Sequence, residues 1–169
     1  MDGGQGKNKG ELYGNLKELI VITSDKRHRL YSLLKMTQMQ RTAIEEMDLD
    51  LLAKYLGEKQ RHIDAIDALD VRFTEIYGSD IKAGLADGGL GQNDPNVRGL
   101  YAQLQTLISD VQEIIKAIHS QEESNNTKAQ EAMEDLKQKI GHIQTGKKGH
   151  SAYTQTHDIS EGMFIDQKK

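Results

Sequence analysis

The sequence contains no cysteine and no tryptophan, and it has one proline and two phenylalanines in 169 residues. Without cysteine the chain can form no disulfide, no thiolate nucleophile and no thiolate metal site. The scarcity of proline and of large aromatic residues argues against β-sandwiches, β-barrels and α/β enzymes, whose turns and cores use them. Within the sequence no apolar run exceeds the four residues Leu19–Ile22, so we expect no insertion into a membrane.

Charge and hydrophobic content narrow the class of protein further. The formal net charge is −4, from 22 basic and 26 acidic residues, so a basic face that binds nucleic acid is not expected. Leu, Ile, Val and Phe total 38 residues, just above the level of about 20% below which chains usually stay disordered. We therefore expect a helical protein with a slender core. The first ten residues lack the apolar stretch of a signal peptide, which predicts a cytoplasmic location.

A coiled-coil pattern begins near the N-terminus. Apolar residues recur at alternating steps of three and four, the spacing of a helical seam, and this predicts a helix over residues 11–46. The seam consists of Leu12, Leu16, Leu19, Thr23, Lys26, Leu30, Leu33, Thr37, Gln40 and Ile44. Residues 1–10 carry four glycines and, after Met1, no apolar residue, so we expect a flexible arm there.

A second helix is predicted over residues 49–77, directly after the first. Asp48 is a good N-cap, because its carboxylate can accept the free amide protons of the next turn. The second seam consists of Leu49, Leu52, Leu56, Lys59, Ile63, Ile66, Leu69, Phe73 and Ile76. The two helices should form an antiparallel hairpin with a very short turn. Gly78 is expected to end the second helix in the left-handed conformation, and residues 78–93, with five glycines, should form a loop.

A third helix is predicted over residues 95–144. Asp94 and Pro95 suit the N-cap and the first helical position. Its seam runs through Val97, Leu100, Leu104, Leu107, Val111, Ile114 and Ile118. The seam weakens at 121–128 and then resumes, so the sequence allows one helix or two helices that break near 124–126. The fold class that follows is all-α: an elongated antiparallel bundle of three long helices with coiled-coil-like packing and a flexible tail, 146–169.

The sequence offers little catalytic chemistry. It has six histidines but no Glu-x-x-His, the spacing that places both metal ligands on the inner face of a bundle helix. Residues 141–147 match part of a phosphate-binding loop, but they close a predicted helix, whereas such a loop follows a strand and opens a helix. We therefore expect no enzymatic activity, no metal and no cofactor.

The hairpin and the tail carry a family resemblance. The hairpin contains a Leu-rich helix start followed by a charged triplet: Asp48-Leu49, Leu52, Leu56 and Glu58-Lys59-Gln60. The tail contains Ala152-Tyr153, Gly162, Ile165-Asp166 and Lys168. Together these features resemble the FlgN-type flagellar export chaperones. The resemblance implies a cytoplasmic protein without catalytic activity that keeps hook-associated (hook–filament junction) proteins soluble and delivers them to the flagellar type III secretion gate.

Two groups of residues are candidate partner-binding sites. The predicted third helix is longer than either arm of the hairpin, so its far half should be incompletely covered. The apolar residues of that half are Met133, Leu136, Ile140 and Ile143. We expect them to form a groove for a client helix, or alternatively the core of a homodimer.

The second candidate group lies in the tail. Its apolar residues are Tyr153, Ile159, Met163, Phe164 and Ile165. They either fold back onto the third helix or order when a partner binds. The resemblance assigns Tyr153 to docking at the export gate, and Phe164 and Ile165 to client contact. The alternative function is a structural coiled-coil adaptor or homodimerisation protein with no chaperone role.

Overall fold

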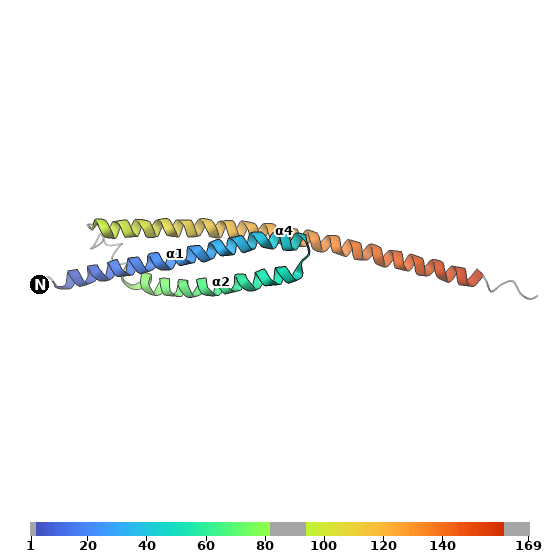
Figure 1. Cartoon of the computed structure of the whole chain (residues 1–169), viewed down its shortest axis with the longest axis horizontal. Coiled ribbons are helices and arrows are strands. Elements are labelled where there is room, and N and C mark those ends of the chain that lie inside the picture. Colours follow the sequence, from blue (N-terminus) through green and yellow to red (C-terminus); the bar gives the residue numbers. More distant parts are fainter. Residues whose placement is uncertain (1–2, 82–93, 161–169) are drawn as a thin grey trace, which may run out of the picture. The chain divides into compact units, whose positions relative to one another are not determined.

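The computed structural model describes the backbone of residues 3–81 and 94–160, and the side chains of residues 10–78, 81 and 94–148. It contains α1 (Gly3–Glu45), α2 (Leu49–Ile76), the short π-helical turn η1 (Tyr77–Ile81) and α4 (Pro95–Ser160) (Figure 1). The described residues form helices and turns and no strand. The predicted all-α fold with three long helices is therefore confirmed. The chain divides into two compact units, Met1–Asn126 and Thr127–Lys169.

The helices α1 and α2 form the predicted antiparallel hairpin. Lys26 Nζ of α1 donates to Asp70 of α2 at 2.6 and 2.7 Å. Further along α1, Gln40 accepts a hydrogen bond of 2.9 Å from Lys59 Nζ. The partner numbers fall along α2 as they rise along α1, which defines the antiparallel direction.

The first part of α4 runs parallel to α1 in the same unit. Arg27 of α1 donates to Asp110 of α4 at 2.9 Å, and Asn125 Nδ2 donates to the carbonyl oxygen of Thr37 at 2.7 Å. Both numbers rise together, so α1 and this part of α4 point the same way. Consecutive helices thus alternate in direction, as in an up-down-up bundle.

Two apolar clusters make the core of the first unit. One contains Leu12, Leu16, Leu19, Ile81, Val97 and Leu104. The other contains Leu30, Leu33, Ile66, Val111 and Ile114. Most of these residues belong to the predicted seams of the first and third helices, so both seams face the core as expected. Ile81 was not predicted, and it is fully buried.

The seam of α2 differs from its prediction, because only half of it is covered. Lys59 and Ile66 are buried, but Leu49 and Leu56 are 74% and 53% exposed, and Ile63 is exposed as well. The buried members lie at one heptad position of the seam and the exposed members at the other. Both rows of an a/d seam are buried only when neighbouring helices cover both of them. In the described part of the chain, other helices cover the row with Lys59 and Ile66 and leave the row with Leu49, Leu56 and Ile63 exposed.

The turn between α1 and α2 is a tight motif shared by two helix ends. Met47 takes the left-handed conformation with φ 55. The amide of Asp48 bonds the carbonyl of Ala43 at 2.9 Å, and the amide of Met47 bonds that of Ile44 at 3.2 Å, which is the Schellman pattern. Asp48 Oδ1 also accepts from the amide of Leu51 at 2.9 Å. The predicted N-cap is confirmed, and the same residue closes α1 and opens α2.

Two helix ends differ from the sequence-based expectation. The first helix begins at Gly3, inside the segment expected to be a flexible arm. No proline interrupts this segment, so its backbone can continue the helical hydrogen bonds, although its glycines lower the helix propensity. After Ile76 the chain continues into η1, and Gly78 has no positive φ, so it is not a left-handed cap. The continued turn carries Ile81 into the core, and residues 82–93 of the predicted loop lie outside the described residues.

The helix α4 is continuous from Pro95 to Ser160, so the sequence's two alternatives resolve to one helix. Asn125, in the segment where a break was considered, is buried and bonded to the carbonyl of Thr37. This bond satisfies the polar side chain that otherwise competes with helical backbone bonds. The helix also passes through Gly146 and extends into the expected flexible tail, since glycine lowers helix propensity without forbidding it.

Candidate partner-binding surfaces

The far part of α4 carries a row of exposed apolar side chains. Its members follow steps of three, four and three, so they share one helix face: Met133, Leu136, Ile140 and Ile143. Each is between 45% and 61% exposed. We call this row the distal seam. The exposure expected for these four residues is present, and their role in binding remains a prediction.

Basic residues flank the distal seam. Lys137 and Lys139 occupy the two positions beside the row at Leu136 and Ile140, equivalent to e and g of a heptad. Both are exposed, and Lys137 Nζ lies 3.9 Å from Glu134. A partner helix with an apolar stripe and acidic flanks suits this surface.

The apolar tail residues predicted to bind a partner are only partly within the described structure. Tyr153 and Ile159 lie in α4, but their side chains are outside the described set. Met163, Phe164 and Ile165 lie outside the described residues altogether. Their assignments to the gate and to the client therefore stay predictions.

Near the hairpin end, the first unit contains a polar layer made by three helices: Thr37, Gln40, Lys59, Glu122 and Asn125. Lys59 Nζ donates to Gln40 Oε1 at 2.9 Å and is ion-paired with Glu122. The side chain of Lys59 is 10% exposed and that of Glu122 is 44% exposed, so only the lysine is desolvated. Because a buried ammonium without partners is costly, this pairing fixes how α2 meets α4.

The same layer joins α4 to α1. Asn125 donates to the carbonyl of Thr37 and accepts a hydrogen bond of 3.0 Å from Gln121. Arg41 donates to Ser124 at 3.3 Å. From the sequence, Gln121, Ser124 and Asn125 mark a weakening of the third seam, whereas the structure gives each of them a hydrogen bond at this layer.

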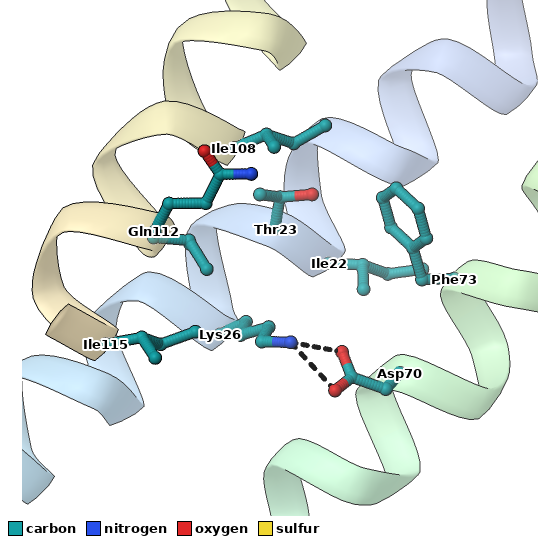
Figure 2. Close-up of a pocket in the computed structure, with 9 residues that line it drawn as sticks. Ile22, Thr23, Lys26, Asp70, Phe73, Ile108, Gln112 and Ile115 are labelled. Carbon is teal, nitrogen blue, oxygen red and sulfur yellow. Dashed lines mark hydrogen bonds and ion pairs between the residues drawn. The ribbon is translucent and has the colours of Figure 1, made fainter. Parts of the chain in front are cut away.

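A groove lies between α2 and α4, with α1 at its base (Figure 2). Its volume is about 280 Å³. It is lined by Ile22, Thr23, Lys26, Asp70, Phe73, Ile108, Val111, Gln112 and Ile115. The Lys26–Asp70 ion pair spans α1 and α2 at one edge of the groove, and Figure 2 shows Ile108, Gln112 and Ile115 along the α4 side.

Sequence reasoning missed this groove because it assigned the whole α2 seam to the core. The exposed half of that seam, Leu49, Leu56 and Ile63, follows a seven-residue spacing that leads to Asp70 at the groove edge. Ile115 is also 45% exposed on the α4 side. The sequence signal for this surface is the row Leu49, Leu56 and Ile63, which repeats every seven residues beside the buried row of α2.

The described residues offer binding surfaces and no assembled metal site. No group of three or more His, Asp or Glu in the described part of the chain is placed to hold a metal ion. Nor does any described helix combine the length and hydropathy needed to cross a bilayer.

Comparison with known proteins places the chain in a family. The model of the family described as FlgN protein matches residues 15–160, which is most of the chain and includes α2, α4 and the larger part of α1 from residue 15 onward. No curated protein and no solved structure shows significant similarity.

Proposed function

This chain belongs to the FlgN family of flagellar export chaperones, and we propose that it binds hook-associated proteins in the cytoplasm and delivers them to the flagellar type III secretion gate. The observation that carries the proposal is the distal seam, a row of four exposed apolar side chains on one helix face. Exposed apolar rows of this kind are typical of protein-interaction sites.

The chemistry of the distal seam suits a helical client. Alternating steps of three and four match the anchor pattern of an amphipathic helix. Covering the apolar side chains of both helices removes them from water, which keeps the client soluble until export. No catalysis or cofactor is needed, and the FlgN family is a family of chaperones.

The tail supplies the second part of the proposed function. We assign Tyr153 to docking at the export gate, and Phe164 and Ile165 to client contact, with Ile159 and Met163 as supporting apolar residues. The family resemblance supports the assignments of Tyr153, Phe164 and Ile165, and the apolar character of Ile159 and Met163 places them in the same group. Deleting residues 150–169 should abolish client capture while the melting temperature stays nearly unchanged, because the core clusters lie entirely before residue 115.

The test uses purified chain and purified hook-associated proteins from the same organism. Leu136→Asp places a charge in the distal seam and should weaken client binding by about 30-fold or more, as at an interface hot spot. Gln138→Asp is the matched control, because it adds the same charge on the same helix away from the seam. Calorimetry measures affinity, and circular dichroism checks that both variants keep their helix content.

The alternative, a structural adaptor without a chaperone role, predicts a different outcome. In that case the wild-type chain binds no hook-associated protein, although the distal seam remains exposed. Equal affinity of Leu136→Asp and Gln138→Asp for a client that does bind would instead place the client site elsewhere.

A further inference from the structure

The distal part of α4 sorts its charged residues by helix face. When the distal seam is numbered as a heptad, its four members alternate between positions a and d, and positions e and g flank them. From residue 130 to residue 146 the flanking positions hold Gln130, Ala132, Lys137, Lys139, Gln144 and Gly146. No acidic residue is among them. The two lysines are both exposed and lie one on each side of the middle of the row.

The carboxylates of the same segment lie on the other side of the helix. Glu131, Glu134 and Asp135 fall at positions f, b and c, which point away from the distal seam. Glu131 accepts a hydrogen bond of 2.7 Å from Lys128 Nζ, so it is occupied on that side. Glu134 lies 3.9 Å from Lys137, but the two side chains are 63% and 70% exposed, so solvent weakens this pair. Lys137 therefore keeps most of its charge available to a partner.

The row also ends in a basic residue. Lys147 occupies the a position that follows Ile143, and it is exposed. Within the described residues Lys139 forms no ion pair. A partner helix on the distal seam thus meets apolar side chains along its centre. It meets positive charge on both flanks and at one end, and no negative charge.

We propose that the distal seam selects an amphipathic helix that carries acidic residues at its own e and g positions. Apolar residues of that helix would cover the seam, while its flanking carboxylates would pair with Lys137 and Lys139. Identifying this helix as a segment of the client rests on the proposed function. The inference adds the chemical class of the segment, which is apolar at a and d and acidic at the flanks.

A second copy of this segment does not offer the required charges. In an antiparallel pair e meets e and g meets g, so a pair centred on Gln138 places each flanking lysine opposite the same lysine of the other copy. In a parallel pair g meets the following e, so Lys139 faces Gln144 and Lys137 faces Ala132. Neither direction forms an ion pair, and the first creates repulsion.

The width of the row favours a helix over a lipid surface. Its members keep to positions a and d, which is the narrow stripe of a coiled-coil seam, whereas a helix lying on a membrane presents a broader apolar face. Helices at membrane interfaces also use Trp and Phe as anchors. Residues 127–148 contain no aromatic residue of either kind and no tyrosine.

The first test uses the full chain and two synthetic helical peptides of three heptads, each with Ile at every a and Leu at every d. One peptide has Glu at every e and g position, and the other has Lys there, so like charges oppose self-pairing in both. Only binding that Leu136→Asp abolishes is attributed to the distal seam. In fluorescence anisotropy the acidic peptide should bind this site at least about tenfold more tightly. Equal affinities, or tighter binding of the basic peptide, overturn the proposal.

Charge reversal identifies the residues responsible. The double variant Lys137→Glu with Lys139→Glu should reverse the preference, so that the basic peptide binds more tightly. The matched control is Lys128→Glu with Lys148→Glu, which changes the net charge equally on the same helix at positions c and b. The control should still prefer the acidic peptide, and circular dichroism should show equal helix content. If both double variants change the preference equally, net charge and not the flanks decides binding, and the proposal is wrong.

The same variants separate this inference from the proposed function. The affinity for a purified hook-associated protein should fall about tenfold when the lysines at 137 and 139 are reversed, and it should hold in the control. Client binding that Leu136→Asp abolishes but this reversal leaves unchanged refutes the acidic complement and leaves the proposed function in place. A chain that prefers the acidic peptide but binds no hook-associated protein refutes the proposed function and leaves the charge selectivity of the seam in place.

A lipid surface gives a different result. Vesicles containing equal parts of phosphatidylcholine and phosphatidylglycerol should not bind the chain through the distal seam. Vesicle binding that Leu136→Asp abolishes, together with no binding of the acidic peptide, assigns the seam to an anionic membrane and overturns the proposal.

Discussion

Met47 lies in the left-handed conformation, and its φ of 55 decides whether glycine or alanine at this position gives the more stable protein. At φ 55 a residue with a β-carbon costs about 1–2 kcal/mol, which glycine avoids. Glycine also gains conformational freedom in the unfolded state, which offsets about 0.5–1 kcal/mol. Met47→Gly should therefore be more stable than Met47→Ala by about 0.5–1 kcal/mol. Both variants lose the half-exposed methionine side chain beyond the β-carbon, so this loss cancels when the stability of Met47→Gly is compared with that of Met47→Ala.

The neighbouring Glu46 provides the control for this prediction. Its amide bonds the carbonyl of Thr42 at 2.9 Å in helical geometry, and its φ is not positive. Glu46→Gly should therefore be less stable than Glu46→Ala by about 0.5–1 kcal/mol. Urea unfolding of the four variants measures the differences, and the melting temperatures should differ by about 1–4 °C within each pair. If alanine is as stable as glycine at position 47, the proposed turn geometry is wrong.

Three further predictions concern stability and are all measured by denaturant unfolding with circular dichroism. Asp48→Ala should lose about 1 kcal/mol because the amide of Leu51 loses its acceptor, and Asp48→Asn should lose less. Leu56→Ala should cost under about 1 kcal/mol because Leu56 is exposed, whereas the fully buried Leu104→Ala should cost about 2–5 kcal/mol. Similar costs would contradict the exposed half-seam of α2. Lys59→Ala should cost about 1–3 kcal/mol because the buried Gln40 loses its donor, and a neutral effect would show that the polar layer is not formed.

The sequence predicted those parts of the fold in which one helix face decides the outcome. Leu16, Leu19 and Leu104 are fully buried seam members because heptad spacing alone places them on a common face. The capping role of Asp48 was also predictable, because the amide groups of the first helical turn lack partners within the helix and a preceding carboxylate can accept from them. These features depend on residues close together in the chain.

The α2 groove and the polar layer could not be predicted in the same way. Whether Leu56 is buried depends on how many helices flank α2, and heptad spacing does not state that number. Likewise, Asn125 suggested a helix break because an asparagine side chain competes for the hydrogen bonds of the helix backbone. Its actual partner, the carbonyl of Thr37, lies 88 residues away in sequence, where local pattern does not reveal it. Tertiary contacts therefore decide both whether Leu56 is buried and whether α4 continues through Asn125, and the local sequence pattern does not contain that information.

The position of the polar layer explains how one helix can belong to a core and still present an interaction surface. Apolar seams tolerate sliding by a heptad, because each step replaces one apolar contact by a similar one. Lys59 allows no such step, since sliding would leave its ammonium buried without Gln40 and Glu122. The layer therefore fixes the register of α4 against α1 and α2. It follows that the apolar core of the first unit ends at a defined residue of α4, and the exposed distal seam lies further along the same helix.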